Sequence, residues 1–420
     1  MELVKRAPKK IIPQDLTAVL LTESVTGELS YNDIAARLES VEGVSVSRQA
    51  IWKKFGDPCV EFMRGVLESV IAAKLPGVEK ASQLGSHFGR VIVQDSTVLK
   101  LPSKLFEYFS GVSNGASTVC NARIQVVYDL LAETFVAFSI DPYSKNDLLA
   151  APELELRVGD LVLRDRGYLI NDEIQRHLNA GADCIYRHKY GNVYLDPQSG
   201  NPIDLAAKLS KEGQLDIEVL LGNAARTKVR IVAAMASDET VARRRMNAKK
   251  TMKRHSPTED YLRMLSWTIF VTTIPKSIVS FEELLEIYGL RWRIETIFKS
   301  WKSNMGFAKI HNVSKKQLEV LVTARLAMIV MISQLVYHPA SQVIRKKYGK
   351  ELSMIKLTKY FVRNPSRIAD VVAGLLGDEK RKSAIEALAK YCAYDSRPRK
   401  NFTKQMTRLH DIFLREFSSR

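Results

Sequence analysis

The segment YGLRWRIETIFKSWK, residues 288–302, surrounds one carboxylate with cations and hydrogen-bonding side chains. Its pattern predicts a helix, and successive residues of an α-helix are rotated by about 100°. On such a helix one face carries the polar residues Tyr288, Arg291, Glu295, Lys299 and Lys302. A solvated face with Glu295 neutralised by its neighbours is the simplest interpretation. The excess of cations around a single acid also suits a phosphate polymer and a metal ion bound together.

The other side of the same predicted helix is apolar. It carries Leu290, Ile294, Ile297, Phe298 and Trp301. An apolar stripe of this width is typical of a helix that packs on a sheet. The segment therefore predicts a docked helix that presents Glu295 from its polar face.

Two further acids end predicted strands. Asp95 follows the run VIVQ, Asp165 follows LVLR, and each precedes a predicted turn. Open α/β sheets place ligand groups at strand ends, although Asp is also a common cap or turn former. Together with Glu295 they make three acids on separate elements. Carboxylates are the ligands that Mg²⁺ prefers, and two such ions about 3.5 to 4 Å apart can drive phosphodiester cleavage.

The charge balance points to a polyanionic partner. The 420 residues contain 63 Lys and Arg against 46 Asp and Glu, a formal net charge of +17. Nucleic acid is the first candidate and an anionic membrane surface the second. No signal peptide is present, so we expect a protein of the bacterial cytoplasm, associated with the nucleoid, and not of a membrane.

Two other features bear on where in the cell the protein is located. The longest apolar run, 318–338, is long enough to span a bilayer, but Glu319, Arg325 and Gln334 interrupt it, which favours a buried helix. The four cysteines stand far apart and predict free thiols rather than disulfides or a zinc site.

The order of predicted elements divides the chain into five regions. Residues 1–82 are helical, and 29–55 resemble a helix-turn-helix, a pattern that any small helical hairpin can also produce. Residues 83–189 mix strands and a helix and predict an α/β layer with a mixed sheet. A β-rich insertion at 190–277 is followed by 278–340, with the Glu295 helix, and by a helical region at 341–420.

The polar residues of the 288–302 segment match a known signature. Tyr288, Arg291, Glu295 and Lys302 fit Y-x(2)-R-x(3)-E-x(6)-K, which resembles the signature of DDE transposases of the IS-four type, the family that includes Tn-five-like enzymes. QDSTVLKLP and LRDRGY resemble the first and second Asp segments of that family. The resemblance covers about 85–310, and it implies an RNase H-like catalytic domain interrupted by the β-rich insertion.

The resemblance also implies roles for individual residues. Asp95, Asp165 and Glu295 would form the catalytic triad and bind two Mg²⁺ or Mn²⁺ ions per active site. Tyr288, Arg291 and Lys302 would contact the DNA backbone of the transposon end, with Lys299 beside them. Asp165 is preferred as second ligand over Asp129, Asp141 and Asp160 because DRGY matches the family.

Trp267 precedes Glu295 by 28 residues. This spacing is similar to that of a Trp that stacks on a flipped base in Tn-five-like members, and such stacking is worth about 1–3 kcal/mol. A Trp at the start of an apolar strand is equally compatible with a place in the core.

The expected function is that of a cut-and-paste DNA transposase. It would bind transposon terminal inverted repeats and target DNA as a homodimer in a synaptic complex, with metal-dependent cleavage and strand transfer. Two alternatives remain: a domesticated relative that only binds DNA, and a metal-dependent nuclease without strand transfer.

Overall fold

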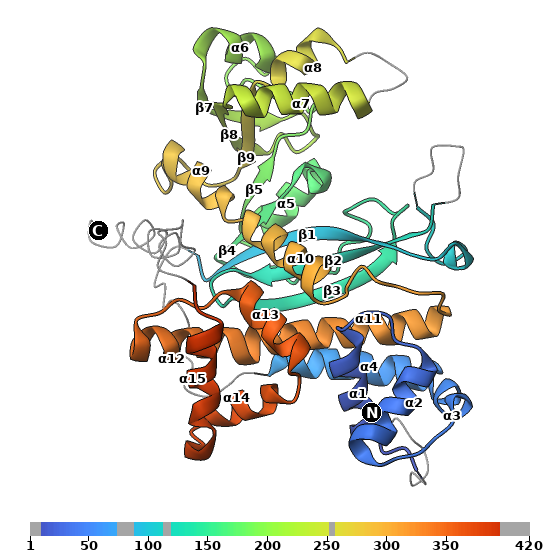
Figure 1. Ribbon diagram of the computed structural model, residues 1–420. Helices are drawn as coiled ribbons and strands as arrows, with labels where there is room; N and C mark the ends of the chain where they lie inside the picture. The colour runs from blue at the N-terminus through green and yellow to red at the C-terminus, as the bar shows by residue number, and fades with distance from the viewer. Residues whose placement is uncertain (1–9, 74–87, 112–118, 252–256, 395–420) are drawn as a thin grey trace. The chain divides into compact units, whose positions relative to one another are not determined.

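The computed structural model describes residues 10–73, 88–111, 119–251 and 257–394 (Figure 1). The chain forms two compact units. Within the described residues, unit 1 comprises 10–73, 96–111, 119–152 and 293–394, and unit 2 comprises 88–95, 153–251 and 257–292. The chain passes from one unit to the other within strand β1 (Arg90–Lys100), between Asp95 and Ser96.

Unit 2 is built on a mixed sheet. Its strands follow the order β1-β4-β5-β9-β8-β7-β6, with β4 at Asp160–Arg164, β5 at Asp183–Arg187, β6 at Tyr194–Leu195, β7 at Leu215–Leu221, β8 at Lys228–Met235 and β9 at Trp267–Thr272. The first three strands are parallel, and the remaining neighbours are antiparallel. Every residue of β4 is buried, because a central parallel strand is covered on both faces. The predicted mixed α/β sheet is confirmed.

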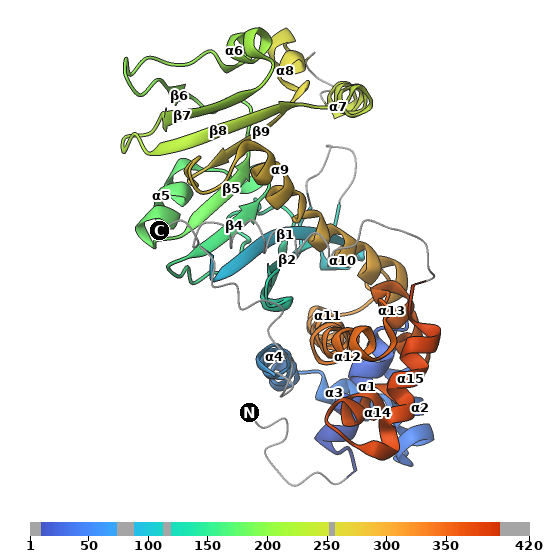
Figure 2. The ribbon, with the colours of Figure 1, turned by 90° about the vertical axis from the view of Figure 1, so that its left-hand side faces the viewer.

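Helices accompany this sheet (Figure 2). They are α5 (Asn171–Asn179), which packs on β5, α6 (Leu205–Glu212), α7 (Asp238–Thr251), α8 (Glu259–Met264) and α9 (Phe281–Gly289). Residues 190–277 hold strands β6 to β9, but also α6, α7 and α8, which the sequence pattern did not predict. α7 is so rich in charged residues that its few apolar residues show no helical periodicity.

Unit 1 combines two antiparallel strands with helices. β2 (Asn121–Asp129) and β3 (Thr134–Pro142) pair across a short turn. The helices are α1 (Pro13–Ser24), α2 (Tyr31–Glu42), α3 (Arg48–Lys54), α4 (Asp57–Ala72), α10 (Trp292–Asn304), α11 (Lys315–Val330), α12 (His338–Tyr348), α13 (Met354–Arg363), α14 (Arg367–Leu375) and α15 (Lys382–Tyr391), with a π-helical segment, η3, at Met331–Tyr337.

Serine side chains cap the starts of several helices. Ser280 and Glu283 form a capping box at the start of α9, and Ser47 caps α3. Each cap supplies an acceptor for backbone N–H groups that the first turn leaves unpaired. The predicted helical hairpin at 29–55 is thus present as α2 and α3, while its role in DNA reading stays a prediction.

The long apolar run is part of a continuous helical stretch, Lys315–Tyr348. By length and composition this stretch alone among the described helices could cross a membrane, but most of its apolar window is buried inside the protein. Arg325 lies within it and donates to the carbonyl oxygens of Ser24, Gly27 and Phe307. All four cysteines are free and buried, as predicted.

Candidate active site

Asp95 and Asp165 lie side by side in unit 2. The parallel register of β1 and β4 pairs Gln94 with Arg164, so the two acids are the next residues on neighbouring strands. Neighbouring strands are about 4.8 Å apart, and residues at the same level point to the same face. The structure therefore brings together the first two acids that the sequence singled out.

The setting of Asp95 differs from the prediction. β1 does not end there but continues to Lys100, so Asp95 lies in the middle of the strand and no turn follows it. The neighbouring strand β4 ends at Arg164. Asp95 therefore lies just past the end of its partner strand β4, which the local sequence of β1 cannot reveal.

Asp165 does not act as a plain cap. It precedes the short 3₁₀ helix η2 (Arg166–Tyr168), yet its side chain makes no capping hydrogen bond. Its Oδ1 atom is buried and has no hydrogen-bond partner in the protein. A buried carboxylate oxygen left without a donor is costly, and metal coordination is one way to satisfy it.

The rival acids are engaged elsewhere. Asp160 forms an ion pair with Arg90 at the other end of the β1–β4 pairing. Asp129 accepts the backbone N–H of Leu131 in the hairpin turn, and Asp141 pairs with Lys145. These contacts give each rival a structural role.

The predicted continuous helix over 288–302 is wrong. α9 ends at Gly289, and α10 begins at Trp292. Between them Leu290 and Arg291 form a tight turn in which the N–H of Arg291 donates to the carbonyl of Tyr288. Glycine disfavours a helix interior, which explains the break at this point. Tyr288 and Arg291 therefore do not share a helical face with Glu295.

Both residues instead face the aspartates of unit 2. Arg291 donates through Nη1 to Asp95 Oδ2 at 2.6 Å, and its guanidinium lies 5.7 Å from the centre of the Tyr288 ring. The Tyr288 hydroxyl donates to the carbonyl oxygen of Arg164 at 3.3 Å. Burial raises the pKa of Tyr288 far above its usual value, and the charge of Asp165 adds to this. Tyr288 is therefore a neutral donor beside the two acids.

Glu295, Lys299 and Lys302 lie on α10, in unit 1. The two lysines are exposed and Glu295 is partly exposed. The apolar stripe of α10 is buried as predicted, and Trp301 packs at 5.7 Å from Phe135 on β3, measured between ring centres. α10 is thus a docked helix with a polar outer face, and the approach of Glu295 to the aspartates stays a prediction.

A half-buried polar group holds the first turn of α10. Arg293 is hydrogen-bonded to the Tyr337 hydroxyl and lies near Glu133. Burial alone would raise the pKa of Glu133, but a hydrogen bond from His338 and the charges of His338, Arg293 and Arg345 hold it below its usual value. His338 Nε2 lies 2.8 Å from the carboxylate of Glu133. This group fixes the start of the helix that carries Glu295.

Trp267 is the first residue of β9 and is half-buried. Its indole Nε1 donates to the carbonyl oxygen of Gly213 at 3.1 Å. Arg244, on α7, donates to the carbonyl oxygens of Leu265 and Trp267 and to the Thr268 hydroxyl. The ring is therefore held in place by protein contacts, and its role toward a base stays a prediction.

Arg166 and Arg187, which the sequence analysis did not single out, lie near Arg243 and Arg244 in unit 2. Burial, together with the charges of Arg187, Arg243 and Arg166, lowers the pKa of Arg244 to about 10. Arg166 directly follows Asp165, and Arg187 is close enough to Tyr288 to affect its pKa. Arg166 lies inside the LRDRGY segment already noted, which was the available signal. A run of basic residues at 243–254 begins on α7, and its residues 252–254 lie outside the described part.

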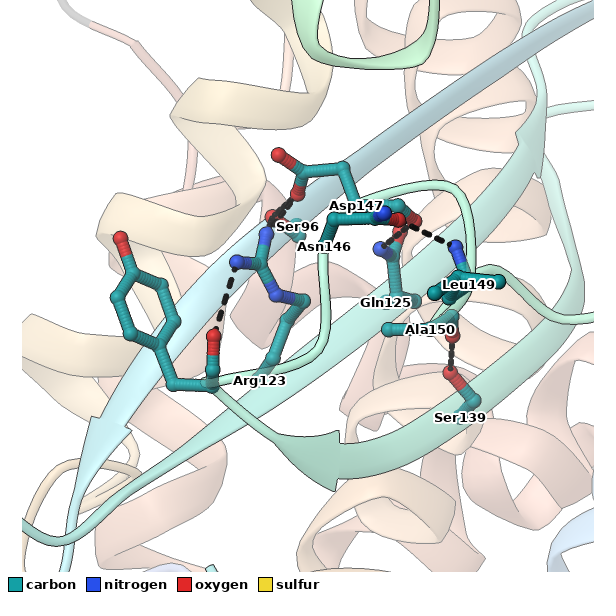
Figure 3. A network of polar contacts seen from close by, with 9 residues as sticks. Ser96, Arg123, Gln125, Ser139, Asn146, Asp147, Leu149 and Ala150 are labelled. Carbon is teal, nitrogen blue, oxygen red and sulfur yellow. Dashed lines mark hydrogen bonds and ion pairs between the residues drawn. The ribbon is translucent and has the colours of Figure 1, made fainter. Parts of the chain in front are cut away.

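In unit 1 a polar network begins at Ser96, the residue after Asp95. Figure 3 shows Arg123 paired with Asp147, to which Ser96 donates at 3.0 Å. Arg123 also donates to the carbonyl oxygen of Tyr143. Gln125 donates to the carbonyl oxygen of Asp147 at 2.8 Å. These bonds fix the loop that follows β3 against the strands, and with it the second half of β1.

The comparison with known families decides the identity of the chain. Residues 86–331 match the family described as the transposase DDE domain. The chain belongs to the DDE transposase family. The predicted resemblance to transposases of the IS-four type is confirmed, and the protein is a DNA transposase, an enzyme of the DDE type.

Individual relatives agree with this membership. The transposase for insertion sequence element IS231B of Bacillus thuringiensis subsp. berliner is 26% identical over 377 residues, which cover 84% of this chain and 78% of the relative. The transposase for insertion sequence element IS1151 of Clostridium perfringens is 26% identical over 361 residues, covering 79% and 75%. Among solved structures, a piggyBac transposase synaptic complex with hairpin DNA aligns over 96% of this chain and 81% of that chain, at 9% identity and a TM-score of 0.48.

Membership in this family implies divalent metal ions. Within the described residues, no three His, Cys, Asp or Glu side chains are grouped in position to hold a metal. The donors in unit 2 nevertheless fit a hard cation, because Asp95 and Asp165 offer adjacent carboxylates and one buried oxygen of Asp165 has no partner. Asp95 and Asp165 would be the ligands that unit 2 contributes.

Proposed function

We propose that this transposase cuts DNA at the transposon ends and joins the freed ends to target DNA. Asp95, Asp165 and Glu295 would be the catalytic residues and the ligands of two Mg²⁺ or Mn²⁺ ions, on an RNase H-like domain. The strongest support for this proposal is that Asp95 and Asp165 are adjacent and that one buried oxygen of Asp165 has no hydrogen-bond partner. When bound, two such ions activate water and stabilise the leaving oxygen of a phosphodiester.

The residues of the chain would position the substrate around these acids. Arg291, which is bonded to Asp95, would bind a phosphate oxygen beside the two acids, because guanidinium groups bind phosphate through two parallel bonds. Tyr288 would keep Arg291 and the end of β4 in place from a buried position. At the same site a water molecule would attack first, and the 3′-hydroxyl it liberates would be the next nucleophile.

Exposed cations would bind the DNA backbone farther from the reacting phosphate. Lys299 and Lys302 are exposed on α10, and the arginines around Arg244 form a second positive surface in unit 2. Trp267 can stack on an unpaired base through its ring face, since its N–H is already bonded to Gly213. This arrangement suits a double-stranded DNA end with one distorted base pair.

Three further elements of the proposal concern assembly. A homodimer would hold two transposon ends in a synaptic complex with the target DNA. The helical hairpin α2–α3, with Arg48 and Lys53 exposed on its second helix, would read the terminal repeats. The protein would act in the bacterial cytoplasm, at the nucleoid.

The decisive experiment uses linear DNA with the inverted repeats that flank the gene, in Mg²⁺ or Mn²⁺. Wild type and Glu295→Gln are compared for end binding, for cleavage at the repeat boundary and for joining to a plasmid. We expect cleavage and joining by the wild type only, and equal end binding by both proteins.

Each departure from this result has a distinct meaning. Binding by both proteins with cleavage by neither would favour a relative that only binds DNA. Cleavage without joined products would favour a nuclease. Cleavage by Glu295→Gln at the wild-type rate would remove Glu295 from the triad.

A further inference from the structure

On the face of the sheet opposite to Asp95 and Asp165 lies a row of buried polar side chains. Because successive residues of a strand alternate between faces, Gln94 and Arg164 point away from the acids that follow them. The register of β1, β4 and β5 sets Gln94, Arg164 and Tyr186 side by side. All three are at most 1% exposed. Polar residues therefore lie directly behind both aspartates.

Arg164 is the centre of this row. Its Nη1 atom donates to Glu173 Oε2 at 2.8 Å and to the Tyr186 hydroxyl at 3.1 Å, and its guanidinium lies 5.6 Å from the centre of the Tyr168 ring. Glu173, in the first turn of α5, is held in turn by Arg176 at 3.0 Å. The side chain of Arg164 is thus fixed from two elements, β5 and α5.

The backbone of Arg164 is fixed as well. Its carbonyl oxygen accepts a hydrogen bond from Tyr288, at 3.3 Å. The peptide unit that joins Arg164 to Asp165 is planar, so a bond to that carbonyl and an anchored side chain together set the direction in which Asp165 leaves the strand. Small rotations here would move the Asp165 carboxylate directly.

Stability does not explain this arrangement. Arg164 Nε, both amide atoms of Gln94 and Nε2 of His177, which contacts Tyr186 edge-on, are buried without hydrogen-bond partners. Buried unsatisfied polar atoms cost about 1–3 kcal/mol each, and apolar residues of similar volume often replace buried ion pairs without loss. A parallel strand of this kind would be served by valine or leucine at position 164.

We propose that Arg164 is a positioning residue, which orients the Asp165 carboxylate for metal binding through its anchors on Glu173 and Tyr186. The proposal rests on the proposed function, in which Asp165 is a metal ligand. Arg164 touches neither the substrate nor the metal and acts through the residue that follows it.

The test measures metal binding separately from turnover. Full-length protein bound to end DNA already cut at the repeat boundary is titrated with Mn²⁺, and free Mn²⁺ is followed by electron paramagnetic resonance. For Arg164→Met we expect the Mn²⁺ dissociation constant to rise about 10- to 100-fold, the range found for residues that orient metal ligands. On uncut DNA, kcat should fall similarly while KM for the DNA stays within about twofold, and Arg164→Lys should restore part of the Mn²⁺ affinity.

Asp160→Asn is the matched control. It breaks the Arg90–Asp160 ion pair at the far end of the same two strands, where Asp160 is equally buried. It should lower the unfolding temperature and leave the Mn²⁺ affinity unchanged. Should Arg164→Met fail to fold, Glu173→Gln takes its place, with an expected several-fold loss of Mn²⁺ affinity.

Three results would overturn the proposal. The first is a folded Arg164→Met variant that binds Mn²⁺ as tightly as the wild type. The second, if Arg164→Met does not fold, is a Glu173→Gln variant that does so. The third is a loss of Mn²⁺ affinity in Asp160→Asn as large as that in Arg164→Met. A wild-type protein that neither binds Mn²⁺ nor cuts DNA would instead contradict the proposed function, and the two failures are therefore distinguishable.

Discussion

The two ends of the β1–β4 pairing use charged residues in opposite ways. At one end Arg90 donates to both oxygens of Asp160, at 2.8 and 2.5 Å, and the backbone N–H of Arg157 donates to the same carboxylate. At the other end Asp95 and Asp165 lie next to each other, and Asp165 Oδ1 has no partner. The first end is satisfied within the protein, whereas at the second Arg291 pairs with Asp95 and one oxygen of Asp165 stays without a partner.

This difference separates polar residues that stabilise the fold from polar residues that serve the site, on one pair of strands. A fully paired buried ion pair stabilises register and leaves nothing for a ligand. Adjacent carboxylates repel each other, and they persist where a cation binds between them. A substitution at the Arg90–Asp160 end of the two strands is therefore a control for a substitution at the Asp95–Asp165 end.

Asp165→Asn should have the largest effect on activity. Removing a metal ligand takes away several kcal/mol of transition-state stabilisation, so we expect cleavage to fall at least about a thousandfold. The unfolding temperature should stay the same or rise, because a charge next to Asp95 is removed. Cleavage assays and thermal unfolding of the same preparation measure both. A large loss of stability would assign Asp165 a structural role and remove the contrast.

Asp160→Asn should lower the stability of the protein and leave its cleavage activity nearly unchanged. Arg90 would keep a buried charge without its carboxylate, which destabilises by about 3 kcal/mol. Cleavage per folded molecule should stay within about twofold of wild type, measured well below the unfolding temperature. A thousandfold loss of cleavage would mean that the two ends of the pairing are not functionally distinct.

The stability of the protein should fall at low pH, in part through His177, which contacts Tyr186 behind the two acids. Burial, aided by the charge of Arg164, lowers the pKa of His177 from 6.5 to about 4. Below pH 6.5 the unfolded chain takes up a proton that the folded protein does not, so stability falls as the pH drops toward 4. This slope is about 1.4 kcal/mol per pH unit for one histidine. Denaturant midpoints at several pH values measure it.

His177→Gln provides the comparison for that slope. His188 is buried too, with its pKa also lowered to about 4, so the variant should lose one histidine's share of the slope and keep the other's. An unchanged slope in His177→Gln would show that His177 takes up its proton normally in the folded state.

Gln94→Met should have the smallest effect, and it should raise the stability of the protein. Both amide atoms of Gln94 are buried without partners, and methionine has a similar shape. Removing such atoms should stabilise the protein by about 1 kcal/mol, which raises the unfolding temperature by a few degrees. Leu163→Met, on the same strand pair but apolar, is the control for packing. A lower unfolding temperature in Gln94→Met than in the control would show that the amide is satisfied.

Local sequence predicted most elements because their signals are local. Ser280 with Glu283 marks the start of α9, and the alternation around Ala132 marks the β2–β3 hairpin. The apolar stripe from Ile294 to Trp301 predicted the buried face of α10. Prediction failed where local signals conflict or are lacking, as at Gly289 within an otherwise helical pattern and in the uniformly charged α7.

The sequence by itself determined which acids and cations this transposase presents, because residue types and their spacing are written in the chain. Only the tertiary structure decided that Asp95 is placed by the end of β4, that Arg291 bonds to it, and that Arg164 lies behind Asp165. Those relations depend on the register between strands far apart in sequence. Register is set by packing across the whole sheet, and no local pattern around residue 95 or 165 encodes it.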